Sequence, residues 1–170
     1  MGLEGERFAI PGVAGIIVKE ENNEHFILMQ QRCKKENNFL EGILEIPSGK
    51  IREFENIFDC LRREIKEETG LIVDYIEGEE NVSRVNKGDY EVISYLPFAC
   101  AQNIQNNYPI MVQVFICKAH GKLLERSNES KDIHWINIKK LSKMLKEDID
   151  KFYPMHIDTL NKYIKIAKNK

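Results

Sequence analysis

The segment from Asn56 to Gly70 constrains the fold more than any other part of the chain. Asn56 is a good N-cap residue, Asp59 follows three positions later as in a capping box, and Gly70 suits a left-handed C-cap. These signals predict a helix over Ile57–Thr69. At 100° per residue, this helix carries one apolar stripe that must face a core, formed by Ile57, Phe58, Leu61 and Ile65.

The rest of the chain alternates between apolar, β-branched runs and polar turns. Strands are expected at residues 13–18, 26–31, 43–46, 71–76, 90–95, 98–101, 111–118 and around 134–136. Polar loops are expected at residues 34–38, 77–88 and 121–131, and further helices at 139–146 and 155–168. Strands alternating with a few helices predict an α/β fold, a sandwich with a mixed β-sheet. We expect a single domain over residues 1–170, with a core at about 10–150 and a C-terminal helix at about 155–168.

Charge and cysteine usage narrow the functional class. The 170 residues carry a formal net charge of -2, with a pI near 6.1, so the sequence offers no broad basic surface for duplex nucleic acid. No apolar run is long enough to cross a membrane, and residues 1–7 lack the pattern of a signal peptide. Four widely spaced cysteines favour reduced thiols and a cytoplasmic location, and Cys100 and Cys117 are expected in the core.

Three carboxylates share one side of the predicted helix. Glu64 and Glu68 lie beside each other at the edge of the apolar stripe, and Glu67 lies one step further round. Like charges so placed repel, and the nearby apolar face adds a desolvation cost. A hard divalent cation such as Mg²⁺ removes this cost. Arg63 also relieves it by pairing with Glu67 or with a carboxylate in the preceding loop. A solvated acidic helix face is the simpler alternative.

The surrounding pattern extends this interpretation. From Gly49 the sequence is GKIREFENIFDCLRREIKEETGL, which resembles the Nudix box, G-x5-E-x7-R-E-U-x-E-E-x-G-U with U apolar. Every fixed position is filled, by Gly49, Glu55, Arg63, Glu64, Ile65, Glu67, Glu68, Gly70 and Leu71. Ser48 departs from the Pro-Gly-Gly that is common before the helix in this family. Looser likeness extends over about residues 13–145, including Trp135 and Leu141.

The resemblance implies an α/β/α sandwich that hydrolyses a nucleoside diphosphate linked to another moiety, such as a nucleotide sugar or a dinucleotide. It implies Mg²⁺ or Mn²⁺ as cofactor, with Glu64, Glu67 and Glu68 as metal ligands. Glu55 is expected either at the metal site or holding Arg63. Gly49 and Gly70 are expected to allow tight backbone turns before and after the helix.

Diphosphate hydrolysis also needs a general base, and the sequence leaves its identity open. The metal lowers the pKa of the attacking water, and a carboxylate then accepts the proton. The base lies either in the box, as Glu64 or Glu67, or in the late polar loop, where Glu129 is the first candidate and Glu125 the reserve. The catalytic set therefore consists of Glu64, Glu67, Glu129 and Arg63. The loop at residues 121–131 has no apolar anchor after Leu124, so we expect it to be mobile until substrate orders it.

Other functions remain as alternatives. A sanitising nucleoside triphosphate pyrophosphohydrolase would use the same box. A non-catalytic nucleotide-binding regulator would keep the fold but is expected to lose a box acid, and none is lost. An mRNA-decapping enzyme would need a basic RNA-binding surface or an added domain. An isopentenyl diphosphate isomerase is a further alternative without a visible signature. The expected partner is a small nucleoside-diphosphate substrate, with no duplex nucleic acid and no membrane, and the expected state is a monomer or a homodimer.

Overall fold

A computed structural model of the chain describes residues 5–33, 40–105 and 108–168. The predicted loop at residues 34–38 lies outside this part. The helix that organises the sequence is confirmed with the predicted bounds, as α1 (Ile57–Thr69). The Asn56 side chain accepts a hydrogen bond of 2.9 Å from the Phe58 amide, and Gly70 caps the other end at φ 81°. All four residues of the predicted apolar stripe are buried.

Ten strands are present in the described residues, eight of them in one sheet. The strands of the large sheet are β1 (Ile10–Glu21), β2 (Glu24–Arg32), β3 (Leu44–Glu45), β4 (Ser48–Lys50), β5 (Ile72–Ile76), β8 (Ala99–Gln102), β9 (Ile110–His120) and β10 (Ser130–Asn137). A separate hairpin consists of β6 (Ser83–Lys87) and β7 (Tyr90–Ser94). The other elements are α2 (Ile138–Glu147), α3 (Pro154–Ala167) and two 3₁₀ turns, η2 (Glu79–Asn81) and η3 (Ile149–Lys151).

The large sheet is mixed, as predicted. Its strands run in the order β10-β2-β1-β9-β5, and β3, β4 and β8 pair with β2, β1 and β9. The pairing of β1 with β9 is parallel, whereas the others are antiparallel. The tight turn between β1 and β2 uses Asn22 and Asn23, which adopt positive φ angles of 52° and 59°. Asparagine tolerates this region better than most residues, which explains the predicted polar turn.

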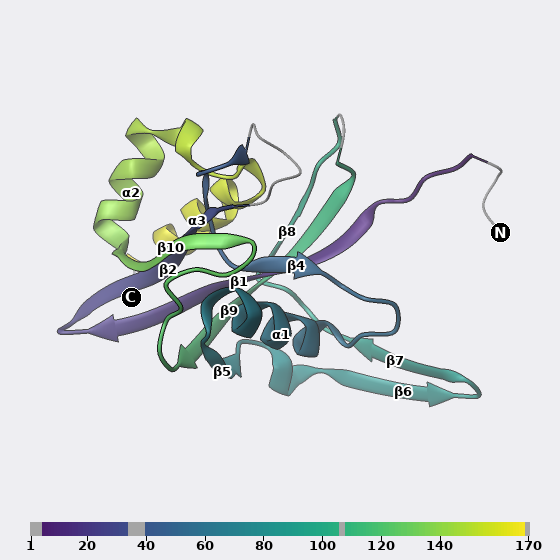
Figure 1. Cartoon of the computed structure of the whole chain (residues 1–170). Helices are drawn as coiled ribbons and strands as arrows, with labels where there is room; N and C mark the ends of the chain where they lie inside the picture. The colour runs from purple at the N-terminus through teal and green to yellow at the C-terminus, as the bar shows by residue number, and fades with distance from the viewer. Residues whose placement is uncertain (1–4, 34–39, 106–107, 169–170) are drawn as a thin grey trace.

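Two apolar layers lie on opposite faces of the sheet, which gives an α/β/α sandwich (Figure 1). The α1 face buries α1 against β1, β2, β5 and β9, with Val13, Ile17, Leu28, Leu61, Ile65 and Phe115 in its core. The opposite face is covered by α2 and α3, with Ile16, Ile27, Met29, Leu141, Leu160 and Ile164 in its core. Alternating side chains of β1 and β2 therefore enter different cores, as strand geometry requires. No helix in the described ranges is long and apolar enough to span a membrane.

Three expectations about strand bounds and burial are corrected. Part of the predicted loop at residues 77–88 is β6, which pairs with β7 and projects from the body (Figure 1). All five residues of β6 are exposed, so the strand lacks the apolar alternation that marks a half-buried strand. The last strand begins at Ser130, inside the predicted loop at residues 121–131. Cys117 is buried as expected, but Cys100 is exposed.

Candidate functional site

Two glycines beside the acidic helix allow other groups to approach the backbone closely. A Cβ at Gly49 would overlap the carboxyl group of Glu64, so the glycine permits that side chain to lie directly against β4. Gly49 does not have a positive φ, so its role is close approach rather than the expected tight turn. Gly70 does have a positive φ, and a Cβ there would also come within 2.9 Å of the Lys122 carbonyl oxygen.

Arg63 is the centre of an ion-pair network. Its guanidinium donates to both oxygens of Glu55 at 2.8 Å and to Glu64 at 2.5 Å, and it lies 3.5 Å from Glu67. The hydrogen bonds from Arg63 lower the pKa of Glu55 to about 2. The structure thus brings Arg63 to both partners that the sequence offered as alternatives, and it adds Glu64. Glu55 was expected either at the metal site or holding Arg63. In the structure it holds Arg63 through two hydrogen bonds.

Glu68 lies deeper than the helical pattern suggests. It is only 3% exposed, whereas Glu67 on the same helix has a side chain that is 55% exposed. One carboxylate oxygen of Glu68 accepts a hydrogen bond of 2.8 Å from the Gln30 side chain and one of 3.0 Å from the Ser48 amide. Gln30 was not predicted as a site residue from the sequence. A glutamine that follows the buried run of β2 was the available signal, since a polar residue in such a place needs a partner.

Glu129 lies far from the acidic helix in the sequence but affects it electrostatically in the fold. Burial raises the pKa of Glu64, and the negative charges of Glu67 and Glu129 add to this shift, although Arg63 opposes it. The structure therefore places Glu129 within electrostatic reach of a box acid. Glu125, the reserve candidate, is exposed in the same loop.

The loop that carries Glu129 is tied to α1, contrary to the expectation of an unanchored segment. The buried Ser130 hydroxyl donates to the Glu68 carbonyl oxygen at 2.9 Å, and the Leu124 amide donates to the Thr69 carbonyl oxygen at 2.9 Å. The Ser127 hydroxyl accepts from the amides of Glu129 and Ser130 at 3.2 and 3.0 Å. These polar contacts replace the apolar anchor that the sequence lacks.

The carboxylates of Glu64, Glu67 and Glu68 offer the type of donor atom that a hard divalent cation binds, since carboxylate oxygens are the ligands that Mg²⁺ prefers. Within the described ranges, no three His, Cys, Asp or Glu side chains already form a group able to hold a metal. Instead, the positive guanidinium of Arg63 lies against Glu55, Glu64 and Glu67. Burial is the largest cause of the raised pKa of Glu64, and the negative charges of Glu67 and Glu129 add to it, so an added positive charge would favour the ionised form of this acid.

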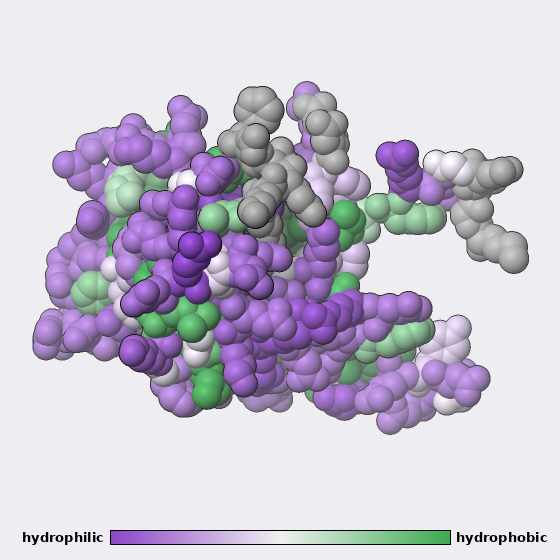
Figure 2. Space-filling model, in the orientation of Figure 1, coloured by the Kyte–Doolittle hydropathy of each residue, from purple (hydrophilic) through white to green (hydrophobic). Residues whose placement is uncertain are grey.

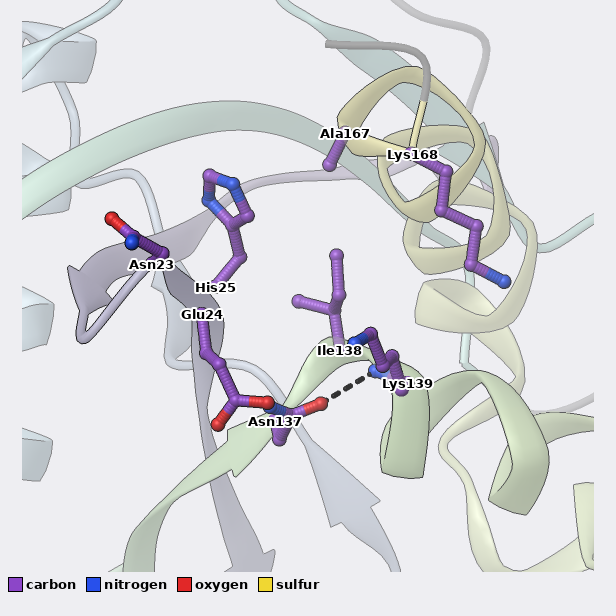
Figure 3. A pocket seen from close by; sticks show the side chains of 8 residues that line it. All are labelled: Asn23, Glu24, His25, Asn137, Ile138, Lys139, Ala167 and Lys168. Carbon is purple, nitrogen blue, oxygen red and sulfur yellow. Dashed lines mark hydrogen bonds between the residues drawn. The ribbon is translucent and has the colours of Figure 1, made fainter.

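A separate pocket of about 450 Å³ lies at the ends of α2 and α3 (Figure 3). None of its lining residues belongs to the acidic site. Two of the polar side chains around it are engaged elsewhere, because Asn137 caps α2 by accepting from the Lys139 amide and Lys168 donates to Ser142. The view in Figure 2 is mostly hydrophilic, with hydrophobic residues in separate patches. The acidic site on α1 therefore remains the strongest candidate for chemistry.

Comparison with known proteins identifies the family of the chain. The NUDIX domain family model matches residues 10–156. The m7GpppN-mRNA hydrolase of Saccharomyces cerevisiae (strain ATCC 204508 / S288c) is 29% identical over 143 residues, which are 83% of this chain and 12% of that protein. The chain thus spans only a small part of this relative.

Solved structures agree at the level of the fold. The MutT protein from Methanosarcina mazei Go1 is 17% identical with a TM-score of 0.63, and the match covers 95% of this chain and 96% of that chain. The NUDIX domain of Shewanella oneidensis NrtR, solved in complex with ADP ribose, is 14% identical with a TM-score of 0.64, covering 99% and 92%. With the family match extending over most of its length, this chain belongs to the NUDIX domain family.

Proposed function

We propose that this protein is a metal-dependent pyrophosphohydrolase that cleaves the diphosphate bond of a nucleoside diphosphate linked to another moiety. The observation that carries the proposal is the cluster of box acids around Arg63 on α1, with the loop of Glu129 hydrogen-bonded to the same helix. The charge of Glu129 acts on Glu64, and Ser130 ties the loop of Glu129 to Glu68. Metal ligands and a candidate base are the two parts that such a reaction requires.

Glu64, Glu67 and Glu68 are the residues that would hold Mg²⁺ or Mn²⁺. When bound, such an ion neutralises the diphosphate and lowers the pKa of the attacking water. Arg63 balances the charge of the acids that surround it, and Glu55 fixes the guanidinium through two hydrogen bonds of 2.8 Å. Gly49 leaves the space into which the Glu64 carboxyl extends.

Glu129 is the proposed general base. The oxygen of a water molecule attacks one phosphorus, the bond from that phosphorus to the bridging oxygen breaks, and the water proton passes to the Glu129 carboxylate. The products are two phosphate monoesters when both ends of the diphosphate are esterified. The hydrogen bonds of Ser127 and Ser130 hold the backbone of Glu129, so the side chain need not be recruited from a disordered loop.

For the substrate, we propose a nucleotide sugar, a dinucleotide or a related compound. The ADP ribose in the Shewanella neighbour supports a nucleoside diphosphate joined to a sugar. The name of the yeast relative keeps a capped RNA end among the compounds to be tested. For the location, we propose a reducing, cytoplasmic setting, because the four cysteines are widely spaced in the sequence.

A hydrolysis screen tests the proposal directly. Nucleotide sugars, dinucleotides, nucleoside triphosphates and a cap dinucleotide are incubated with the protein and Mg²⁺ or Mn²⁺, and the products are separated by anion-exchange chromatography. We expect cleavage of at least one class with release of a nucleoside monophosphate, abolished by excess chelator and restored by added metal. Full turnover in excess chelator would contradict metal dependence, and no cleavage of any class would favour a binding regulator.

A further inference from the structure

Gln30 is a polar residue in one of the most tightly packed parts of the sheet. It follows Leu28 and Met29 on β2, and all three residues are fully buried. Its neighbour Gln31 is partly exposed and donates instead to Asp132 at 3.0 Å. A buried amide in a strand interior is unfavourable unless its hydrogen-bonding groups are used, so its partner indicates its role.

That partner is the Glu68 carboxylate. The Gln30 side-chain nitrogen donates to one oxygen at 2.8 Å, and the Ser48 amide donates to the same oxygen at 3.0 Å. The two donors come from β2 and β4, while the carboxylate comes from α1. Two hydrogen bonds from different strands to one oxygen restrict the rotation of the side chain that carries it.

The side-chain oxygen of Gln30 indicates that the hydrogen bond to Glu68 fixes the orientation of the amide. In the described part of the chain, the Gln30 side-chain oxygen is buried without a hydrogen-bond donor. Turning the amide over would place this oxygen against the carboxylate of Glu68, which is repulsive. An apolar residue of similar size would fill the same space without a polar atom left unsatisfied. The gain that offsets this cost is the hydrogen bond to Glu68.

We propose that Gln30 is a positioning residue, one that orients Glu68 for binding of the divalent cation. This inference rests on the proposed function, because it requires Glu68 to be a metal ligand. It adds a residue outside the box, 38 positions before Glu68 in the sequence. Residues that orient metal ligands typically contribute 10- to 100-fold to metal affinity.

The test compares two matched variants, Gln30→Met and Gln31→Met. Binding of Mn²⁺ without substrate is measured by electron paramagnetic resonance of the free ion. We expect Gln30→Met to weaken Mn²⁺ binding by about 10- to 100-fold, whereas Gln31→Met keeps the affinity of the parent protein. At saturating metal, kcat of Gln30→Met should recover toward the parent value, and KM for the cleaved substrate should stay unchanged.

A merely structural role for Gln30 predicts a different pattern, with a lower midpoint of thermal unfolding and unchanged Mn²⁺ affinity. That pattern overturns the inference. If Gln30→Met does not fold, Gln30→Asn keeps the amide but withdraws it by one methylene, and parent-like Mn²⁺ affinity in that variant also overturns it. Glu68→Gln separates the two proposals. If Glu68→Gln loses Mn²⁺ binding while Gln30→Met does not, only the role of Gln30 fails, whereas retained binding in Glu68→Gln refutes the metal site itself.

Discussion

The two faces of the sheet bury polar groups in different ways. On the α1 face, acids lie at the edge of the core and are held by charged or amide donors, as Arg63 holds Glu55 and Glu64 and Gln30 holds Glu68. On the α2 and α3 face, the buried His156 has a different partner, the amide of Ile46, which lies 3.3 Å from its Nδ1. Burial and the positive charge of Arg32 lower the pKa of His156 to about 3.

The α1 face therefore has the character of a functional site. The face covered by α2 and α3, called the scaffold face below, mainly supports the fold. The acids of α1 form a cluster of negative charge that the single guanidinium of Arg63 only partly balances, as expected for a site that receives a cation. His156 instead stays neutral at ordinary pH and connects α3 to the segment that leads into β4. Changes on the first face should therefore alter activity more than stability, and changes on the second face should do the reverse.

The largest effect is expected from removing a box acid. Glu64→Gln and Glu68→Gln should each lower turnover by on the order of 10²-fold or more, a loss of about 3 kcal/mol in the barrier. The reason is that a neutral amide holds a divalent cation less well than a carboxylate does. Steady-state rates with Mg²⁺ on the cleaved substrate provide the measurement. Glu147→Gln in α2 is the control, since its exposed carboxylate contacts only Lys143 at 3.8 Å among the described ion pairs. Parent-like turnover in both box variants would remove the distinction between the two faces.

A somewhat smaller effect is expected at Glu129. Glu129→Gln should lower turnover by about 10²-fold, the low end for a general base, while metal affinity and the Michaelis constant stay nearly unchanged. Glu125→Gln is the matched control in the same loop and should have little effect. Damage from Glu125→Gln alone would move the base to that residue. If both variants behave like the parent, the base lies in the box, at Glu64 or Glu67.

The contribution of the scaffold face to stability is tested by lowering the pH. Because the folded-state pKa of His156 is about 3 and the unfolded value is about 6.5, the neutral histidine contributes full stability above pH 6.5. This contribution is lost as the pH falls toward 3, by roughly 1.4 kcal/mol per pH unit well inside the window. Urea unfolding between pH 7 and 4.5 should show a shallower decline in His156→Gln than in the parent. Equal slopes would mean that this histidine does not govern the acid sensitivity.

The smallest effect is expected at two matched helix caps. Asn56 caps α1 and Asn137 caps α2, with nearly the same backbone angles and with side chains accepting from the second residue of each helix at 2.9 and 2.8 Å. Asn56→Ala and Asn137→Ala should each lower the free energy of unfolding by about 1 kcal/mol. Only Asn56→Ala should also reduce turnover, because α1 carries the acids. A larger loss of turnover in Asn137→Ala would contradict the assignment of chemistry to the α1 face.

Much of the fold was predictable from the sequence because its signals are local. The bounds of α1, its caps and its apolar stripe follow from hydrogen bonds and periodicity within 15 residues. The central strands were predicted to within a few residues, because they are apolar and bounded by polar turns. The strand β6 was missed since both of its faces are exposed, which leaves no periodic signal.

For the site, the sequence by itself determined which acids share the surface of α1 and which glycines flank the helix. Only the tertiary structure decided that Gln30 contacts Glu68, that Ser130 anchors the late loop and that Glu129 acts on Glu64. Gln30 and Glu68 are 38 residues apart in the sequence, and Ser130 and Glu68 are 62 apart, so no local rule relates the partners. Their meeting depends on how β2 and β10 pair in the sheet and on how α1 packs across it. Strand register and helix packing are set by the burial of the whole core rather than by any one segment.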